Sequence, residues 1–186
     1  MKKIKNMEFT NELKDWEKEI VEKYPLIYKE PNIELQQWYK AERFEELTKD
    51  PNFTNLRYGF EFDQGWSKIV DEFSNTVQQL VVHLRSTVQP DAYVYSSIFK
   101  EKFGSICWQG DDNLQEPFKT LFQALLRSLE RESLNTCEIT GNSGTLCQRG
   151  GWRKVLCREQ AKEQGYLPIN QGVADHWKFL DAKENE

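Results

Sequence analysis

Apolar residues recur at helical spacing in three long stretches of the chain. Residues 66–84 carry the clearest stripe, and residues 114–133 carry a second one. Residues 10–24 carry a third, which ends before Pro25. Because such a stripe packs one face of a helix against a core, we predict three core-covering helices.

The segments between these helices are shorter and less regular. Residues 32–48 are expected to form a second N-terminal helix, although their apolar residues are spaced less regularly. Short strands are expected at residues 56–62 and 105–109. Residues 92–103 are ambiguous, because their first residues favour a strand while Gly104 fits the cap of a short helix. We favour the helix.

The C-terminal part has a different pattern. Four glycines between residues 141 and 151 indicate tight turns. Residues 152–164 are predicted to form a short helix, and the residues after 165 are predicted to be a strand or an extended arm.

Together these elements predict an α+β fold that is dominated by helices and has a small antiparallel sheet. We expect residues 1–50 to form a helical pair that packs on a main domain of residues 51–186. A chain of 186 residues suits this size and can bury a core without a disulfide or a metal ion.

Composition and charge narrow the classes of protein further. Six Trp, seven Tyr and eleven Phe favour a folded chain, because burying the rings offsets the ordering entropy. The net charge of −5 argues against non-specific nucleic-acid binding. The charged start of the chain resembles no secretory signal, and no stretch is apolar enough to span a membrane. We therefore expect a cytoplasmic protein with reduced cysteines.

One C-terminal segment carries a distinctive pattern. It consists of a CEITG turn at residues 137–141, a GGW sequence at 150–152 and CREQA at 157–161. KEKFG at 100–104 and Gly65-Trp66 lie upstream. Over roughly residues 57–164, this pattern resembles a family of small uncharacterised bacterial and phage proteins. The family has a K-E-K-F-G motif, a C-x-x-C-G turn, a glycine-tryptophan pair and C-x-x-H-A.

The resemblance implies a zinc knuckle with two ligands from a turn and two from the first turn of a helix. Cys137 and Cys157 keep their places, but Thr140 replaces the second cysteine and Gln160 the histidine. Neither hydroxyl nor amide is a competitive zinc ligand beside thiolates, and Cys147 lies off the expected spacing. We therefore expect a degenerate knuckle without metal or other cofactor, in which Cys137 and Cys157 could form a disulfide under oxidation.

A cluster of basic residues around a tryptophan stands out against the acidic background. On a helix, Lys154, Arg158 and Lys162 would share one face. Such a face can contact phosphates or an acidic protein, or it can simply be solvated. The candidate binding residues in this cluster are Arg149, Trp152, Arg153, Lys154, Arg158 and Lys162.

The predicted N-terminal helices also have surplus aromatic residues, among them Trp16, Trp38 and Tyr39. Trp and Tyr are common anchors of protein interfaces. The alternative, which we slightly favour, is that these residues cover the main domain as part of its core. Both interpretations stay open at this point.

Catalytic patterns are absent from the sequence. His83 and His176 are isolated histidines, and neither has a nucleophile or a carboxylate at a recognisable spacing. The chain has no phosphate-binding glycine loop and no nucleophile elbow. We assign no catalytic residue and expect a protein that is not an enzyme.

These observations leave two classes of function. The first is a protein-binding module, for which the resemblance suggests a phage or mobile-element protein that binds and inhibits a host defence protein. The second is a nucleic-acid-associated accessory protein that uses the basic helix face.

Overall fold

The computed structural model describes residues 13–30, 45, 48–49, 53–56 and 58–184, and the following statements concern this part of the chain. Its helices are α1 (Asp15–Lys23), α2 (Pro25–Tyr28), the 3-10 helix η1 (Gln64–Trp66), α5 (Ser67–Ser86), α6 (Phe118–Ser133), α7 (Arg158–Gln164) and α8 (Gln171–Glu184). Its strands are β1 (Phe60–Glu61), β2 (Val94–Lys102), β3 (Ser105–Asp112), β4 (Thr145–Arg149), β5 (Trp152–Leu156) and β6 (Leu167–Pro168).

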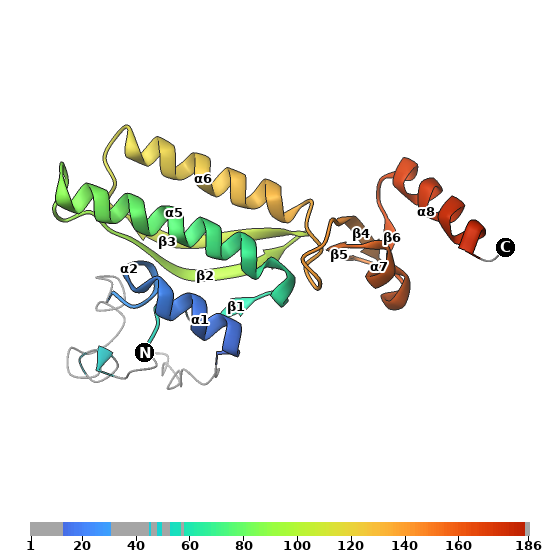
Figure 1. Cartoon of the computed structure of the whole chain (residues 1–186), viewed down its shortest axis with the longest axis horizontal. Helices are drawn as coiled ribbons and strands as arrows, with labels where there is room; N and C mark the ends of the chain where they lie inside the picture. Colours follow the sequence, from blue (N-terminus) through green and yellow to red (C-terminus); the bar gives the residue numbers. More distant parts are fainter. Residues whose placement is uncertain (1–12, 31–44, 46–47, 50–52, 57, 185–186) are drawn as a thin grey trace, which may run out of the picture.

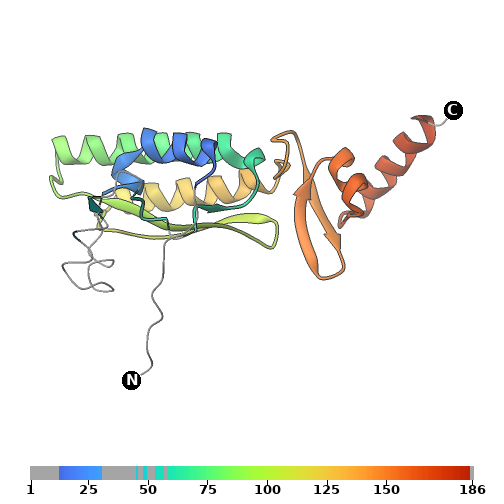
Figure 2. The same ribbon diagram turned by 90° about the horizontal axis from the view of Figure 1, so that it is seen from below.

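The fold is α+β and dominated by helices, as the sequence predicts. The predicted sheet is present as two three-stranded sheets with the orders β1-β2-β3 and β5-β4-β6. The first sheet is mixed, because β1 runs parallel to β2 while β3 runs antiparallel to it. Helices α1, α2, α5 and α6 lie on one side of this sheet, and the second sheet lies at its far end with α7 and α8 (Figures 1 and 2).

Large aromatic side chains fill the space between the helices and the first sheet. Phe99 of β2 lies at the centre, with its ring centroid 5.5 Å from that of Phe60 and 6.1 Å from that of Phe73. Trp108 of β3 contacts Phe122 of α6 edge-on at 5.3 Å. Such edge-to-face contacts add to the stabilisation that burial of the rings provides.

The predicted helix at residues 92–103 is wrong. Most of these residues form β2, which pairs with β3 in an antiparallel hairpin. Gly104, taken as a helix cap, is instead the second residue of the two-residue turn, where both Phe103 (φ 56°) and Gly104 (φ 90°) have positive φ. A glycine with positive φ suits a helix end and a hairpin turn equally well, so the sequence does not separate the two.

Two further predictions fail in the C-terminal unit, by which we mean residues 134–184. The first half of the predicted 152–164 helix is strand β5, and only α7 is helical. The predicted extended arm after residue 165 is mostly helix α8. Asn170 begins α8 by accepting a hydrogen bond from the backbone N–H of Val173 at 3.2 Å.

A tight joint connects the first sheet to the C-terminal unit. The indole Nε1 of Trp66 donates a 2.7 Å hydrogen bond to the carbonyl oxygen of Thr136. Gly65 lies so close that a Cβ there would approach the carbonyl oxygens of Cys137 and Glu138 to 2.4 Å. The joint therefore requires glycine at this position, and it holds the C-terminal unit against η1.

The predicted N-terminal helix at 10–24 is present as α1, within the part of the chain that is described. Most of the second predicted helix, residues 32–48, lies outside the described residues. No helix of the described chain is both long enough and apolar enough to cross a membrane.

Candidate functional site

The C-terminal unit brings the positions of the degenerate knuckle together. Cys137 and Thr140 lie on a turn closed by Gly141 (φ 75°), and Cys157 is the N-cap of α7. The Thr140 hydroxyl lies 3.9 Å from the Sγ of Cys157. Gln160 follows one helical turn later and hydrogen-bonds to Glu163. The turn and the helix start thus face each other across Thr140.

Three cysteines lie in the small core of this unit. Cys137, Cys147 and Cys157 are buried there and make no disulfide. Burial raises the pKa of the Cys137 thiol, but hydrogen bonds from the Thr140 hydroxyl and from backbone N–H groups, including that of Cys157, outweigh it and leave this pKa below its usual value. Burial raises the pKa of Cys147 to about 11, and it also raises that of Cys157.

This donor set does not fit a zinc ion. Zinc needs four good donors in tetrahedral geometry, whereas Thr140 directs a hydroxyl at the thiol of Cys157. Among the residues that the structure describes, no group of three or more His, Cys, Asp or Glu side chains is placed to hold a metal ion. Within the described residues, the turn and α7 are joined by packing in the small core and by the contact of Thr140 with Cys157.

The predicted basic helix face does not form. Lys154 lies on strand β5, whereas Arg158 and Lys162 lie on α7. The Nζ of Lys154 lies 3.3 Å from Glu138 and 3.4 Å from Asp63. The prediction that Lys154 lies on a helix face is wrong, because its segment is a strand.

The two cations on α7 are also paired within the protein. Arg158 and Lys162 both contact the carboxylate of Asp181 on α8, at 3.8 and 3.2 Å. Arg149 donates to the carbonyl oxygen of Gln164 at 2.6 Å, and its guanidinium lies over the ring of Tyr166 at 4.8 Å. Four of the six candidate residues of this cluster are thus engaged internally.

The remaining two candidates lie at the tip of the β4–β5 hairpin, which we call the hairpin tip (Gln148–Arg153). Trp152 is 76% exposed, and Arg153 is exposed and forms no ion pair with any described residue. A hydrogen bond of 2.8 Å from the Gln148 amide to the carbonyl oxygen of Gly150 fixes the turn. No atom lies within 4 Å of the positions where Cβ atoms of Gly150 and Gly151 would be, so the turn projects freely.

No protein-family model, no curated protein and no solved structure matches the chain.

The other predicted site residues lie elsewhere. Trp16 packs beside Phe60 and Phe62 at ring distances of 5.3 and 6.1 Å, which makes it part of the first core. Trp38 and Tyr39 lie outside the described residues. His83 on α5 and His176 on α8 are both exposed.

The carboxyl group of Glu138 is buried, and the sequence pattern did not predict it as a site residue. Glu138 is 3% exposed and carries one oxygen without a hydrogen-bond partner in the described structure. Burial raises its pKa, whereas the charge of Lys154 lowers it; the net pKa lies above the usual value. Its partner Lys154 also reaches Asp63, which is 91 residues away in sequence and so invisible to local patterns.

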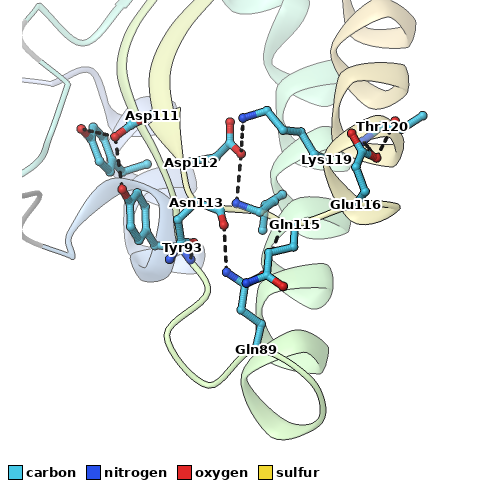
Figure 3. A network of polar contacts seen from close by, with 11 residues as sticks. Gln89, Tyr93, Asp111, Asp112, Asn113, Gln115, Glu116, Lys119 and Thr120 are labelled. Atoms are coloured by element: carbon cyan, nitrogen blue, oxygen red, sulfur yellow. Dashed lines mark hydrogen bonds and ion pairs between the residues drawn. The ribbon is translucent and has the colours of Figure 1, made fainter.

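A second polar network closes the opposite end of the first sheet (Figure 3). The Tyr93 and Tyr95 hydroxyls both donate to Asp111, at 3.2 and 3.4 Å. Gln89 donates to the carbonyl oxygen of Asn113 at 2.9 Å. These contacts connect the end of the β2–β3 hairpin to the loop after α5, and we assign them a structural role.

Proposed function

We propose that this protein is a protein-binding module whose C-terminal unit presents the hairpin tip to its partner. The observation that carries the proposal is Trp152, a large aromatic side chain that is 76% exposed at the end of a projecting turn. Trp and Arg are the residues most enriched at the energetic centres of protein interfaces. Arg153, exposed beside it, adds a cation that the described protein does not neutralise.

The backbone of the tip is restrained on both sides of the turn. The Gln148 to Gly150 hydrogen bond restrains the turn, and Arg149 is held against Tyr166 and Gln164. A preorganised contact loses less conformational entropy on binding than a flexible one does. Trp152 therefore projects from a restrained backbone, which lowers the entropic cost of binding through this residue.

Protein is favoured over nucleic acid as the partner because of the internal ion pairs. Phosphate binding needs several cations available along one surface. Lys154, Arg158 and Lys162 instead contact carboxylates of the same chain. With a chain charge of −5, this leaves little free positive charge for a polyanion.

The resemblance to bacterial and phage proteins directs the search for the partner. We propose that the partner is a bacterial host protein, and that binding at the hairpin tip inhibits it in the manner of phage proteins that disable host defences. Steric occupation by the tip would be sufficient for such inhibition, so the proposal needs no catalytic residue.

Affinity capture from a nuclease-treated bacterial lysate tests the proposal. We expect the unmodified protein to retain one partner in stoichiometric amount. In Trp152→Ala the affinity for this partner should fall by at least about tenfold, as it does when a hot-spot residue is truncated. Mass spectrometry identifies the partner, and calorimetry with the purified partner measures the change in affinity.

Phe179→Ala is the matched control, since Phe179 is also a large exposed aromatic but lies on α8. It should capture the partner as the unmodified protein does. Equal capture by Trp152→Ala would refute the role of the tip. Capture that disappears after nuclease treatment, and that falls steeply with salt, would instead support the nucleic-acid alternative.

A further inference from the structure

Strand β3 forms an edge of the first sheet that is open along much of its length. It pairs with β2 on one side only. Ser105 pairs with Lys102 next to the hairpin turn, so its backbone groups point toward β2. From Ile106 onward, every second residue of β3 therefore directs its backbone N–H and C=O away from β2. The N–H of Ile106 is one of these outward groups, and it donates to Ser133 of α6 at 3.0 Å.

The outward groups further along β3 have no such partner. By the same alternation, Trp108 and Gly110 direct their N–H and C=O groups away from β2. Within the described part of the chain, neither residue makes a backbone hydrogen bond on that side. A row of free donors and acceptors on a sheet edge is a template for an added strand.

A groove runs between this edge and α6, and we call the two together the edge groove. It encloses about 430 Å³. Its apolar lining comes from Phe103, Ile106 and Trp108 on the hairpin side and from Leu126 and Leu129 on α6. A strand added to β3 would place alternate side chains into this lining.

Phe103 gives a second and independent indication that the groove is used. Its φ of 56° lies in the left-handed region, which is unfavourable for a bulky residue. Its ring is nevertheless 70% exposed, so folding gains little from it. Two-residue hairpin turns of this kind favour Asn followed by Gly. An exposed aromatic at a position that favours asparagine suggests a role in binding.

We propose that the edge groove binds an extended segment of a partner protein that alternates apolar and acidic residues. The apolar side chains would enter the groove, and the backbone would hydrogen-bond to Trp108 and Gly110. Charge at the rim favours the acidic residues. Lys102 and Arg127 are exposed cations without an ion pair among the described residues, and Glu130 is the one carboxylate among the described residues that line the groove. This surface is separate from the hairpin tip and does not depend on it.

Fluorescence anisotropy with a labelled eight-residue peptide of alternating glutamate and valine or leucine tests this site. We expect saturable binding, which should weaken roughly tenfold or more in Phe103→Asn and in Arg127→Glu. A peptide with lysine in place of glutamate should bind more weakly, and a peptide N-methylated at alternate residues should not bind. In the complex, the amide hydrogens of Trp108 and Gly110 should become protected from exchange.

The variants keep the test interpretable. Phe103→Asn suits the turn, so it should fold with at least the stability of the unmodified chain. Val88→Asn removes another exposed apolar side chain away from the groove and should bind normally, as should Trp152→Ala. Loss of lysate capture in Trp152→Ala with normal peptide binding would therefore report on the hairpin tip alone.

Three results would overturn the proposal. The first is the absence of saturable peptide binding up to millimolar concentration. The second is binding that is unchanged by Phe103→Asn and by N-methylation. The third is a concentration-dependent dimer of the protein that Phe103→Asn abolishes, because β3 would then pair with a second copy rather than with a partner.

Discussion

Gly65 lies where the first sheet and the C-terminal unit come closest. A Cβ at this position would lie 2.4 Å from two backbone carbonyl oxygens. These oxygens cannot move without displacing the turn at residues 137–141, which we call the knuckle turn. We expect Gly65→Ala to reduce the free energy of unfolding by about 1–3 kcal/mol, as overpacked sites do. Urea denaturation monitored by tryptophan fluorescence measures the change.

Gly151→Ala provides the matched control for this prediction, because no atom lies within 4 Å of a Cβ at that position. Its stability should stay within about 0.5 kcal/mol of the unmodified protein. If the two variants were equally stable, the close approach at Gly65 would have no energetic consequence.

Glu138 should make the stability depend on pH. Burial is the main reason that its pKa is above the usual value. A carboxyl group whose pKa is higher in the folded chain stabilises the fold below its unfolded pKa, and this stabilisation is lost as pH rises through the folded pKa. The unmodified protein should therefore lose stability relative to Glu138→Gln as pH rises from about 4, the usual pKa of a glutamate, through the raised pKa of Glu138.

Urea denaturation of both proteins over this pH range measures the difference. Glu163→Gln, which changes an exposed carboxyl group on α7, should follow the unmodified protein at every pH. If the free energy of unfolding changed with pH in the same way for the unmodified protein and Glu138→Gln, this would contradict the effect of burial on the Glu138 carboxyl group.

At the scale of elements, the knuckle turn and α7 keep an arrangement into which metal ligands can be placed. Thr140 lies 3.9 Å from the Sγ of Cys157, and Gln160 is one turn along the same helix. We expect Thr140→Cys combined with Gln160→His to bind about one zinc ion per chain, since four good donors would then be available. Elemental analysis measures the metal content.

Zinc binding should also stabilise the double variant, because the ion binds the folded unit far better than the unfolded chain. A chelator should then lower its melting temperature but leave that of the unmodified protein unchanged. Each single variant should purify without stoichiometric zinc. A double variant without zinc would show that the turn and helix are not spaced for tetrahedral coordination.

Elements with a long apolar stripe could be predicted from the sequence, and those that depend on one turn could not. The stripe of α5 extends over five turns and allows no other interpretation. Strand β2 was missed because the Phe103-Gly104 turn resembles a helix end. Strand β5 has only five residues, too few to distinguish a period of two from a helical one.

At the scale of the whole molecule, the hairpin tip could be predicted in part. Trp152 and Arg153 were among the candidates, because the sequence shows a tryptophan within a basic cluster. The sequence could not show that Lys154 contacts Asp63, 91 residues away, or that Arg158 and Lys162 share Asp181. Pairings of this kind depend on the tertiary fold, and they decide which charges stay available to a partner.

The C-terminal unit has a small core of its own but also contributes residues to the larger core. Val155 of the second sheet belongs to the larger core and Leu146 packs against it, and a Cβ at Gly104 would lie 2.2 Å from Leu146. In evolutionary terms, we do not expect the C-terminal unit to be exchanged independently of the rest of the chain. A recombination event that exchanged it near residue 134 would also replace part of the neighbouring core, so we expect the surfaces carried by the two halves to be inherited together.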